Sequence, residues 1–595
     1  MKKESRKTWM MKTRKMSALI ILSFSPLFLF QAAAQSMNVS VDSVGQLSRE
    51  LPDSIRFKVA ELKVTGPLNG TDLKLLNQIV TRTKINKKET GECLVTSIDL
   101  SEAVITEGKE GMKTETNALP GSLFSGAKNL VRAVLPQNTV SIGRNCFDNC
   151  SALSDINIPE TVITIGSNAF SDCTSLSDLS LPPSLTTIEH DAFEGCTSLT
   201  TIEIPKTVTS FGNNAFAGCS SLKKVSILAD IKSIETATFM DCESLAEVSV
   251  PESITAVGNN AFRNCKTLTT ISLPDKLDEI GNSAFEKCIS LESISINKVD
   301  KIGSNAFQEC SSLKSLEVEG VSKMGNGAFL KCLNMDSISI QGSLDNLGMD
   351  MFNECSNLKM VILPNSIKKI ESRAFQNCKS LYEIKLPTSL TKMNDGIFEG
   401  CSTLRCIVIP NMVKSMGKSV FEDCTALDSV RIEGFIDEID TDAFRHCHSL
   451  RSITLPTSVK KIDSKAFEEC TALTNINLPI TLQSIGNDAF AKCVMLQSIV
   501  IPAAVKEIGS DAFRECSAMT TAELAVGLKS IGGSAFAKCV SLREVKVNAP
   551  LPPKISKSTF KDVVLGACKF YIPRGSRMHY SQDKQWQKIP QLLER

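Results

Sequence analysis

Cysteine is the residue type in this sequence with the greatest capacity for chemistry. The chain of 595 residues contains 22 Cys but only 4 His. Thiols can form disulfides, ligate metal ions or, once deprotonated, act as nucleophiles. Eighteen of the cysteines follow one another at intervals of 23 residues, or 22 in two cases, and each has a Phe three residues earlier. This cysteine ladder consists of Cys150, Cys173, Cys196, Cys219, Cys242, Cys265, Cys288, Cys310, Cys332, Cys355, Cys378, Cys401, Cys424, Cys447, Cys470, Cys493, Cys516 and Cys539.

The regular spacing of the ladder argues against disulfides, although the even cysteine count would allow them. Side chains at one repeated position run parallel on neighbouring strands, about 4.8 Å apart. A disulfide needs Cβ atoms about 3.5–4.5 Å apart that face each other. Pairing one interface would also leave the next, identical interface unpaired. We therefore expect buried free thiols, which behave as small, mostly apolar groups with a weak S–H donor.

The remaining candidates for a metal or catalytic centre are sparse. Cys146-x-x-x-Cys150 has no second pair nearby. The segment His446-Cys447-His448 lacks further ligands, and residues so close in sequence are expected to point in different directions. No phosphate-binding loop or H-E-x-x-H helix is present, and the carboxylates are spread over the repeat surface. We expect no metal, no other cofactor and no enzymatic activity.

Four cysteines lie outside the ladder: Cys93, Cys146, Cys406 and Cys568. Cys146 occupies the place of a small Ala before the repeated Phe and is expected to be buried. Cys406 and Cys568 fall at outward positions of predicted strands. They are candidate reactive thiols, because reactivity requires exposure.

One repeated unit supplies the elements that position these residues. Within Cys173–Cys196, the pattern Leu-x-x-Leu-x-Leu predicts a short strand whose last two leucines share one face. Pro182 ends the strand, because it has no N–H to donate to a ladder. Leu185 and Ile188 then return over the core, and a turn or 3₁₀ segment leads to the next Ala-Phe. Glycines recur in that turn, and we interpret them as positions with positive φ: Gly143, Gly166, Gly212, Gly258 and Gly281.

A strict period over more than 400 residues indicates a solenoid rather than several globular domains. The unit Ala-Phe-x-x-Cys-x-x-Leu-x-x-Ile-x-Ile-Pro resembles the BspA-type leucine-rich repeat family of exported bacterial proteins. The resemblance implies a right-handed leucine-rich repeat superhelix of about 23-residue units, built from short parallel strands with turns or 3₁₀ segments. It also implies a location at the cell surface and binding of host or matrix proteins.

The repeat divides the chain into four parts. Residues 1–34 are predicted to be a signal peptide, 35–118 an N-terminal cap, 119–560 the solenoid and 561–595 a C-terminal cap. In the first cap, Phe57–Val64 is predicted to be a strand and Thr71 to cap a helix over Asp72–Val80. In the second, the pattern around Phe570 predicts a last strand. Tyr580, Trp586, Ile589, Leu592 and Leu593 are predicted to fold over the open end.

The first 34 residues carry the features of an export signal. Seven basic residues precede an apolar run from Ala18 to Phe30, and small residues end at Ala34. The run is too short for a span of about 20 residues. Its removal changes the net charge from +1 to −5, which argues against a nucleic-acid binder. We expect an exported chain with no membrane span, at the cell surface, secreted or in the periplasm.

Three neighbouring units depart from the small polar residues that otherwise face outward on the strands. They expose apolar residues around Tyr382, the one aromatic residue at these strand positions, and basic residues at the margin. Contiguous exposed apolar area, aromatic residues and Arg are enriched at protein-binding sites. The candidate binding residues are Met360, Ile362, Tyr382, Lys385, Arg405, Val408, Arg431 and Arg451.

The sequence thus favours a non-enzymatic adhesion or interaction protein that binds a protein ligand. The patch could instead be covered by the chain's own loops or by a second copy. The alternative function is carbohydrate binding for nutrient capture. That class favours exposed Trp and Tyr, whereas the 2 Trp lie in the signal and the C-terminal cap.

Overall fold

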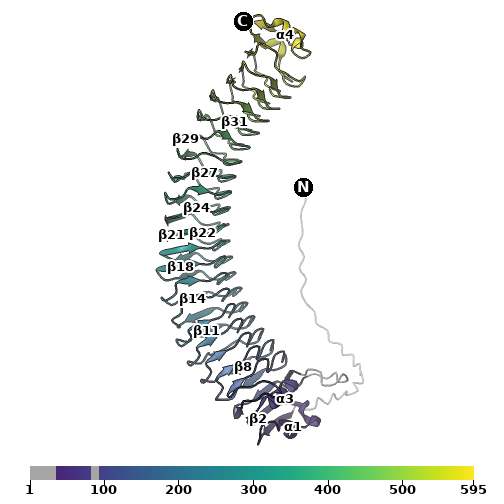
Figure 1. The fold of residues 1–595 in the computed structure, drawn as a ribbon, viewed down its shortest axis with the longest axis vertical. Coiled ribbons are helices and arrows are strands. Elements are labelled where there is room, and N and C mark those ends of the chain that lie inside the picture. The colour runs from purple at the N-terminus through teal and green to yellow at the C-terminus, as the bar shows by residue number, and fades with distance from the viewer. Residues whose placement is uncertain (1–34, 82–92) are drawn as a thin grey trace, which may run out of the picture.

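The computed structural model describes residues 35–81 and 93–595. The predicted signal peptide and the predicted polar loop at residues 84–91 lie outside this part of the chain. The described residues form a parallel β-solenoid, whose rungs stack along a curved axis (Figure 1). The segments with α1 and α4 lie at opposite ends of the arc. The predicted leucine-rich repeat solenoid is therefore confirmed.

Each rung contributes to two ladders of short parallel strands. The first ladder contains the Leu-x-x-Ile-x-Ile segments: β1 Gln35–Ser40, β2 Val59–Leu68, β3 Ser97–Asp99, β6 Arg132–Val134, β8 Asp155–Asn157, β11 Thr201–Ile204, β13 Lys224–Ile227, β15 Glu247–Ser249, β17 Thr270–Ser272, β19 Ser293–Ser295, β21 Ser315–Val321, β23 Ser337–Gly342, β25 Met360–Ile362, β28 Cys406–Ile409, β29 Ser429–Ile432, β33 Ser498–Val500, β35 Thr521–Leu524, β37 Glu544–Val547, β38 Lys569–Ile572 and β39 Leu592–Glu594.

The second ladder lies on the returning side of each rung. Its strands are β4 Ala103–Ile105, β5 Ala118–Leu119, β7 Ser141–Ile142, β9 Thr164–Ile165, β10 Thr187–Ile188, β12 Ser210–Phe211, β14 Ser233–Ile234, β16 Ala256–Val257, β18 Lys276–Ile280, β20 Lys298–Ile302, β22 Lys323–Met324, β24 Asn346–Leu347, β26 Lys369–Ile370, β27 Lys392–Met393, β30 Glu438–Ile439, β31 Lys461–Ile462, β32 Ser484–Ile485, β34 Glu507–Ile508 and β36 Ser530–Ile531.

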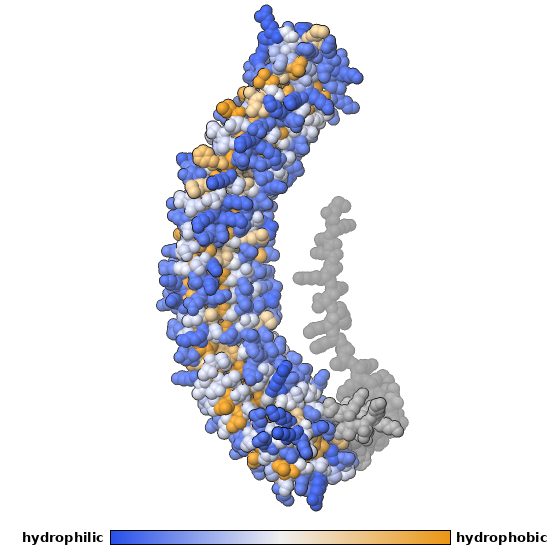
Figure 2. Space-filling model, in the orientation of Figure 1, coloured by the Kyte–Doolittle hydropathy of each residue, from blue (hydrophilic) through white to orange (hydrophobic). Residues whose placement is uncertain are grey.

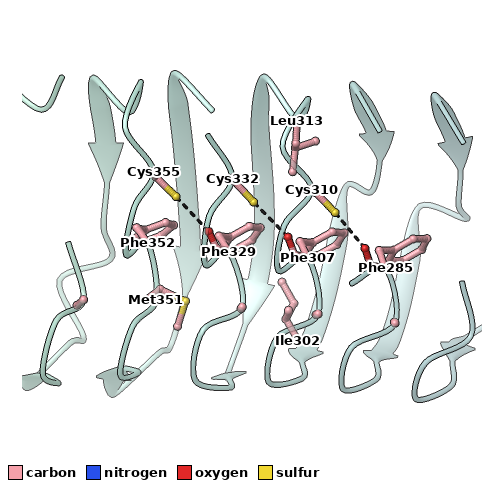
Figure 3. Packing of buried hydrophobic residues seen from close by; sticks show 14 of the residues in the cluster. Phe285, Ile302, Phe307, Cys310, Leu313, Phe329, Cys332, Met351, Phe352 and Cys355 are labelled. Atoms are coloured by element: carbon pink, nitrogen blue, oxygen red, sulfur yellow. Dashed lines mark hydrogen bonds between the residues drawn. The ribbon is translucent and has the colours of Figure 1, made fainter. Parts of the chain in front are cut away.

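A stack of phenylalanine rings runs through the interior between the ladders. From Phe124 to Phe560 the centroid of each ring lies 5.2–5.8 Å from the centroid of the next. Beyond the first pair, the planes of neighbouring rings are inclined to each other by at most 20°. Figure 3 shows four of these rings, from Phe285 to Phe352. The distances fall within the range in which aromatic pairs attract each other. The rings thus form a continuous column in which each ring contacts the ring of the next rung.

Every ladder cysteine is a buried free thiol, as predicted. Its role goes beyond filling space, because each S–H donates to the backbone carbonyl of the Phe in the preceding rung. The Sγ···O distances are 3.0–3.3 Å throughout the ladder, as for Cys310 to Phe285 (Figure 3). Burial raises the pKa of the thiol in most rungs, that of Cys288 to about 12. The protonated form required for donation is therefore the stable one.

Tight turns take the place of the expected 3₁₀ segments around the repeated Phe. Two residues in each full turn have positive φ, such as Asn168 at 55° and Asp172 at 54°. Asn and Asp tolerate this region better than most residues. The interpretation of the repeated glycines was therefore wrong. At Gly212 no positive φ is found, and an added Cβ would lie 2.4 Å from the backbone nitrogen of His190 in the preceding rung.

The N-terminal region continues the first ladder instead of forming a separate unit, since β1, β2, β3, β6 and β8 share one sheet. Its helices are α1 Leu47–Glu50, α2 Asp53–Arg56 and α3 Gly70–Thr81. Asn69, not Thr71, caps α3, because its side-chain oxygen accepts from the N–H groups of Thr71 and Asp72 at 3.0 and 3.3 Å. The buried carboxylate of Asp72 in turn accepts from the N–H of Leu47 at 3.0 Å.

Aromatic side chains close the C-terminal end, as predicted. Its short helices are η1 Leu565–Ala567, α4 Arg577–Gln582 and η2 Trp586–Lys588. Buried Tyr580 and Trp586 donate to the carbonyls of Ala549 and Pro553, both at 2.7 Å. Leu592 and Leu593 differ from expectation, since β39 adds a further parallel rung beside β38. None of the helices in the described residues has the length and hydrophobicity that crossing a bilayer requires.

The thiol hydrogen bond makes a prediction that distinguishes it from simple packing. Cys310→Ser keeps a donor for the Phe285 carbonyl, whereas Cys310→Ala removes it. We expect the Ser variant to be more stable by about 1 kcal/mol in urea unfolding followed by circular dichroism. If the thiol contributed only apolar volume, the more polar Ser would be the less stable of the two.

The close approach at the repeated glycine makes a second prediction. Gly212→Ala should destabilise the fold by about 1–3 kcal/mol, because the added methyl group overlaps the backbone of the preceding rung. Gly566→Ala is the matched control, since nothing lies within 4 Å of a Cβ there. Thermal unfolding of both variants measures the effect. Equal losses at the two positions would contradict the explanation.

Candidate functional site

The eight candidate binding residues all lie on the outward face of the first ladder and are exposed. The residues between them, such as Ile384 and Ile407, are buried in the core. This alternation is the period-2 pattern of a strand with one face in the core. Tyr382 is 54% exposed and Val408 is 47% exposed, so both offer their side chains to a partner.

The stacking of the rungs fixes which candidates are neighbours. The pairing of β28 with β29 sets Val408 beside Arg431. The N–H of Arg405 donates to the carbonyl of Tyr382 at 3.2 Å, so these two residues occupy the same position on adjacent rungs. Met360 and Ile362 lie on β25, where they pair with residues of β23.

A shallow hollow of about 460 Å³ crosses three rungs of this face. Three candidates line it: Lys385, Val408 and Arg431. The other five candidates lie outside its lining, with Tyr382 and Arg405 on the same rungs. The full lining comprises Glu383, Ile384, Lys385, Leu386, Thr388, Cys406, Ile407, Val408, Pro410, Ser429, Val430, Arg431 and Glu433. The hollow therefore has an aliphatic floor and a charged rim.

The charge of the rim differs from the expected basic margin. Glu383 and Glu433 line the hollow together with Lys385 and Arg431. The guanidinium of Arg431 forms an ion pair with Glu433 at 2.7 Å. Both signs of charge are thus present. A ligand would meet a site that discriminates by the placement of charge rather than by net charge.

The first ladder is interrupted at this point. β25 is the last strand of its sheet and β28 pairs only with β29, while residues 381–386 between them form no strand. Among the described residues, none accepts a backbone hydrogen bond from the N–H groups of residues 383–386. The hollow therefore lies over backbone donors that remain for water or for a partner.

Two exposed apolar residues beside the hollow escaped the sequence analysis. Met412 and Phe435 occupy the turns that follow β28 and β29, and Phe435 is 76% exposed. In several other rungs this position holds a hydroxyl that donates to the preceding rung, as Ser389 and Ser458 do to Ile367 and Ile436 at 2.6 Å. A large apolar residue at this turn position on two consecutive rungs was the available signal.

Elsewhere the exposed apolar residues are more isolated. Val500, at the strand position of Val408, is 61% exposed. On the face drawn in Figure 2, hydrophobic residues form small separate groups among hydrophilic ones.

The two candidate reactive thiols have different environments. Cys406 is exposed and lines the hollow. Cys568 is fully buried, and burial raises its pKa to about 11. The expectation of an outward Cys568 was wrong, because it precedes β38 and turns into the core. Cys146 is buried as predicted, and half-buried Cys93 donates to the carbonyl of Val80 at 3.0 Å.

Comparison with known families identifies the repeat. The family described as BspA type leucine rich repeat region, in six copies, matches residues 117–246, 232–359, 322–451 and 437–565. Among curated protein sequences, none matches this chain.

Two solved structures are among those similar to this chain. A leucine-rich repeat protein from Bacteroides ovatus is 24% identical, with 79% of this chain and 90% of that chain covered and a TM-score of 0.33. A leucine rich cell surface protein from Faecalibacterium prausnitzii is 24% identical, with 60% and 88% covered and a TM-score of 0.33.

The thiol environments predict selective modification. Iodoacetamide should alkylate Cys406 first in the native protein, because its side chain is exposed. Cys568 and the ladder thiols should stay protected until the protein is unfolded in urea, because they are buried. Peptide mass spectrometry measures the sites, and Cys406→Ser should remove the fast phase. Rapid native alkylation of Cys568 would contradict the description.

Proposed function

Because the chain belongs to the BspA-type leucine-rich repeat family, we propose that it is a non-enzymatic exported protein that binds a protein ligand at the bacterial cell surface. Proteins built from leucine-rich repeats typically bind other proteins, and this solenoid family is generally non-enzymatic. We place the binding site at the hollow that crosses the rungs of Tyr382, Val408 and Arg431. Lys385, Val408 and Arg431 line this hollow, and the other five candidate residues would extend the contact surface beside it.

The observation that carries this proposal is the apolar strand face, beside which two further irregularities lie on neighbouring rungs. The polar strand face gives way to Met360, Ile362, Tyr382 and Val408. The first ladder is interrupted at residues 381–386. The hydroxyls of the adjoining turns are also lost. Residues 176–181 also form no strand, and other turns also lack the hydroxyl, so the apolar strand face carries the proposal, because a binding site needs apolar anchors beside placed charges.

Export and surface location belong to the same proposal. Residues 1–34 would be removed during export, and residues 35–118 and 561–595 would cap the solenoid at 119–560. Members of the family are typically exported or surface proteins of bacteria. Protease treatment of intact cells, compared with lysed cells, tests the location. Resistance of the protein in intact cells would contradict it.

Carbohydrate capture is less well supported. Glycan sites favour exposed aromatic platforms, whereas Trp586 and Tyr580 are buried in the C-terminal end. Trp9 lies outside the described residues. On the strand face, the exposed Tyr382 lies beside the hollow, and its neighbours are aliphatic and charged.

The proposal predicts a loss of binding without a loss of stability. Labelled protein is incubated with immobilised extracellular matrix proteins and with host-cell surfaces. The double variant Tyr382→Ser, Val408→Asp should bind at least about tenfold less, because an apolar anchor and an aliphatic rim residue are lost together. Its melting temperature should stay that of the parent, since both side chains are exposed.

Val500→Asp is the matched control, since it places the same charge at the same strand position of a distant rung. It should bind as the parent does. Equal binding by the double variant and the parent would refute the proposed site. A change in oligomeric state of the double variant alone, seen by size-exclusion chromatography, would assign the surface to self-association instead.

A further inference from the structure

The strand segments around the hollow carry cations without partners. Each of five consecutive rungs has one cation on its outward face, of which Arg431 is paired with Glu433 at 2.7 Å. The other four are exposed and form no ion pair with any residue that the structure describes: Lys359, Lys385, Arg405 and Arg451. Elsewhere on this ladder several cations pair with a neighbouring rung, as Arg132 does with Asp155 at 2.9 Å. The four free charges are therefore available to a ligand.

Carboxylates on the same strand segments are fewer than the cations. They are Glu383, Asp428 and Glu433, and Glu433 is already paired with Arg431. Asp428 lies beside Arg405, because its N–H donates to the carbonyl of Arg405 at 2.9 Å. These segments thus have a positive net charge, whereas the chain after residue 34 has a net charge of −5. A positive surface on a negative chain draws anionic groups to itself.

Exposed apolar side chains lie beside the hollow at both ends of the strand segments. Tyr382 stands near the start of its segment, while Met412 and Phe435 occupy the turns after β28 and β29. On the rung of Tyr382 the turn position of Phe435 is held by Ser389, seven residues further along. Seven residues of strand span at most about 23 Å, at about 3.3 Å each. An extended ligand chain of similar length can therefore contact both ends.

We propose that the hollow binds an extended, acidic segment of a protein partner, with an apolar side chain at each end and carboxylates between them. One apolar end contacts Tyr382, and the other contacts Met412 and Phe435. The carboxylates meet the free charges of Lys385 and Arg405. This inference rests on the function proposed above and defines the chemistry of the ligand.

The placement of the charges favours a peptide over other anions. A guanidinium can donate two parallel N–H bonds to one carboxylate, and among the described residues no such partner engages Arg405. Glu383 lines the hollow close to Lys385 in sequence, so a further negative charge is repelled at that point. A uniformly charged polymer such as a nucleic acid would bring charge there as well. The aliphatic floor, with Val408 exposed above it, is covered by apolar side chains instead.

Selection from a random peptide library displayed on phage, with the purified full chain immobilised, tests the proposal. We expect the selected peptides to be enriched in Asp and Glu between aromatic or aliphatic residues. A synthetic copy should bind at least about tenfold more weakly at 0.5 M than at 0.05 M NaCl, because salt screens exposed charges. Its counterpart with Asn and Gln in place of Asp and Glu should bind at least about tenfold more weakly than the acidic peptide.

The triple variant Lys385→Gln, Arg405→Gln, Arg451→Gln should also bind the acidic peptide at least about tenfold more weakly. The matched control is Lys223→Gln, Arg543→Gln, Lys569→Gln. It removes three exposed cations of the same ladder that likewise form no ion pair with the described residues. This control should bind as the parent does, and both variants should keep the parent's melting temperature, since all six side chains are exposed.

The proposal is overturned if no peptide is selected, if neutral or basic peptides are selected, or if both triple variants lose binding equally. Stronger binding of single-stranded DNA of the same charge would overturn it in favour of a polyanion. A parent dimer that the first triple variant dissociates would overturn it in favour of a second copy. Host-surface binding that Tyr382→Ser, Val408→Asp abolishes and the first triple variant leaves intact would refute the acidic ligand while upholding the proposed site.

Discussion

The structure depends on one repeated contact between rungs. The ring of each repeated Phe stacks on the next ring. The backbone carbonyl of the same Phe accepts a hydrogen bond from the S–H group of the cysteine one rung further on. The backbone N–H of this Phe also bonds to the next rung, as Phe147 does when it donates to the carbonyl of Ala169 at 2.7 Å. Both backbone polar groups of a buried residue are thus satisfied by its neighbours. A solenoid is only as stable as these nearest-neighbour interfaces, and the thiol supplies a buried donor without introducing a charge.

This interior contact leaves the outward positions free to vary. Strand-face residues can change from Ser or Thr to Met, Tyr or Arg without disturbing the Phe and Cys positions beneath them. The rungs around Tyr382 and the turn of His446 use this freedom differently. The first gathers apolar and charged side chains around a hollow, and the second places the rings of His446 and His448 with their centroids 5.9 Å apart on one turn.

Much of the architecture could be predicted from the sequence, because period and residue type report which positions face the core. The buried free thiols, the parallel strands, the aromatic C-terminal end and the exposure of all eight candidate residues follow from that pattern. Features that depend on the direction of the backbone in the turns could not be predicted from the sequence. The crowding at Gly212, the inward turn of Cys568 and the side-by-side rings of His446 and His448 arise from turn geometry. The carboxylates of Glu383 and Glu433 join the hollow only once neighbouring rungs are stacked.

The Raman S–H stretching band of the native protein tests the central contact most directly. A thiol that donates a hydrogen bond vibrates at lower frequency than a free one. The band should therefore be dominated by a lowered component from the cysteine ladder, which returns to the free position on unfolding in urea. A native band already at the free position, or its replacement by a disulfide band, would contradict the account.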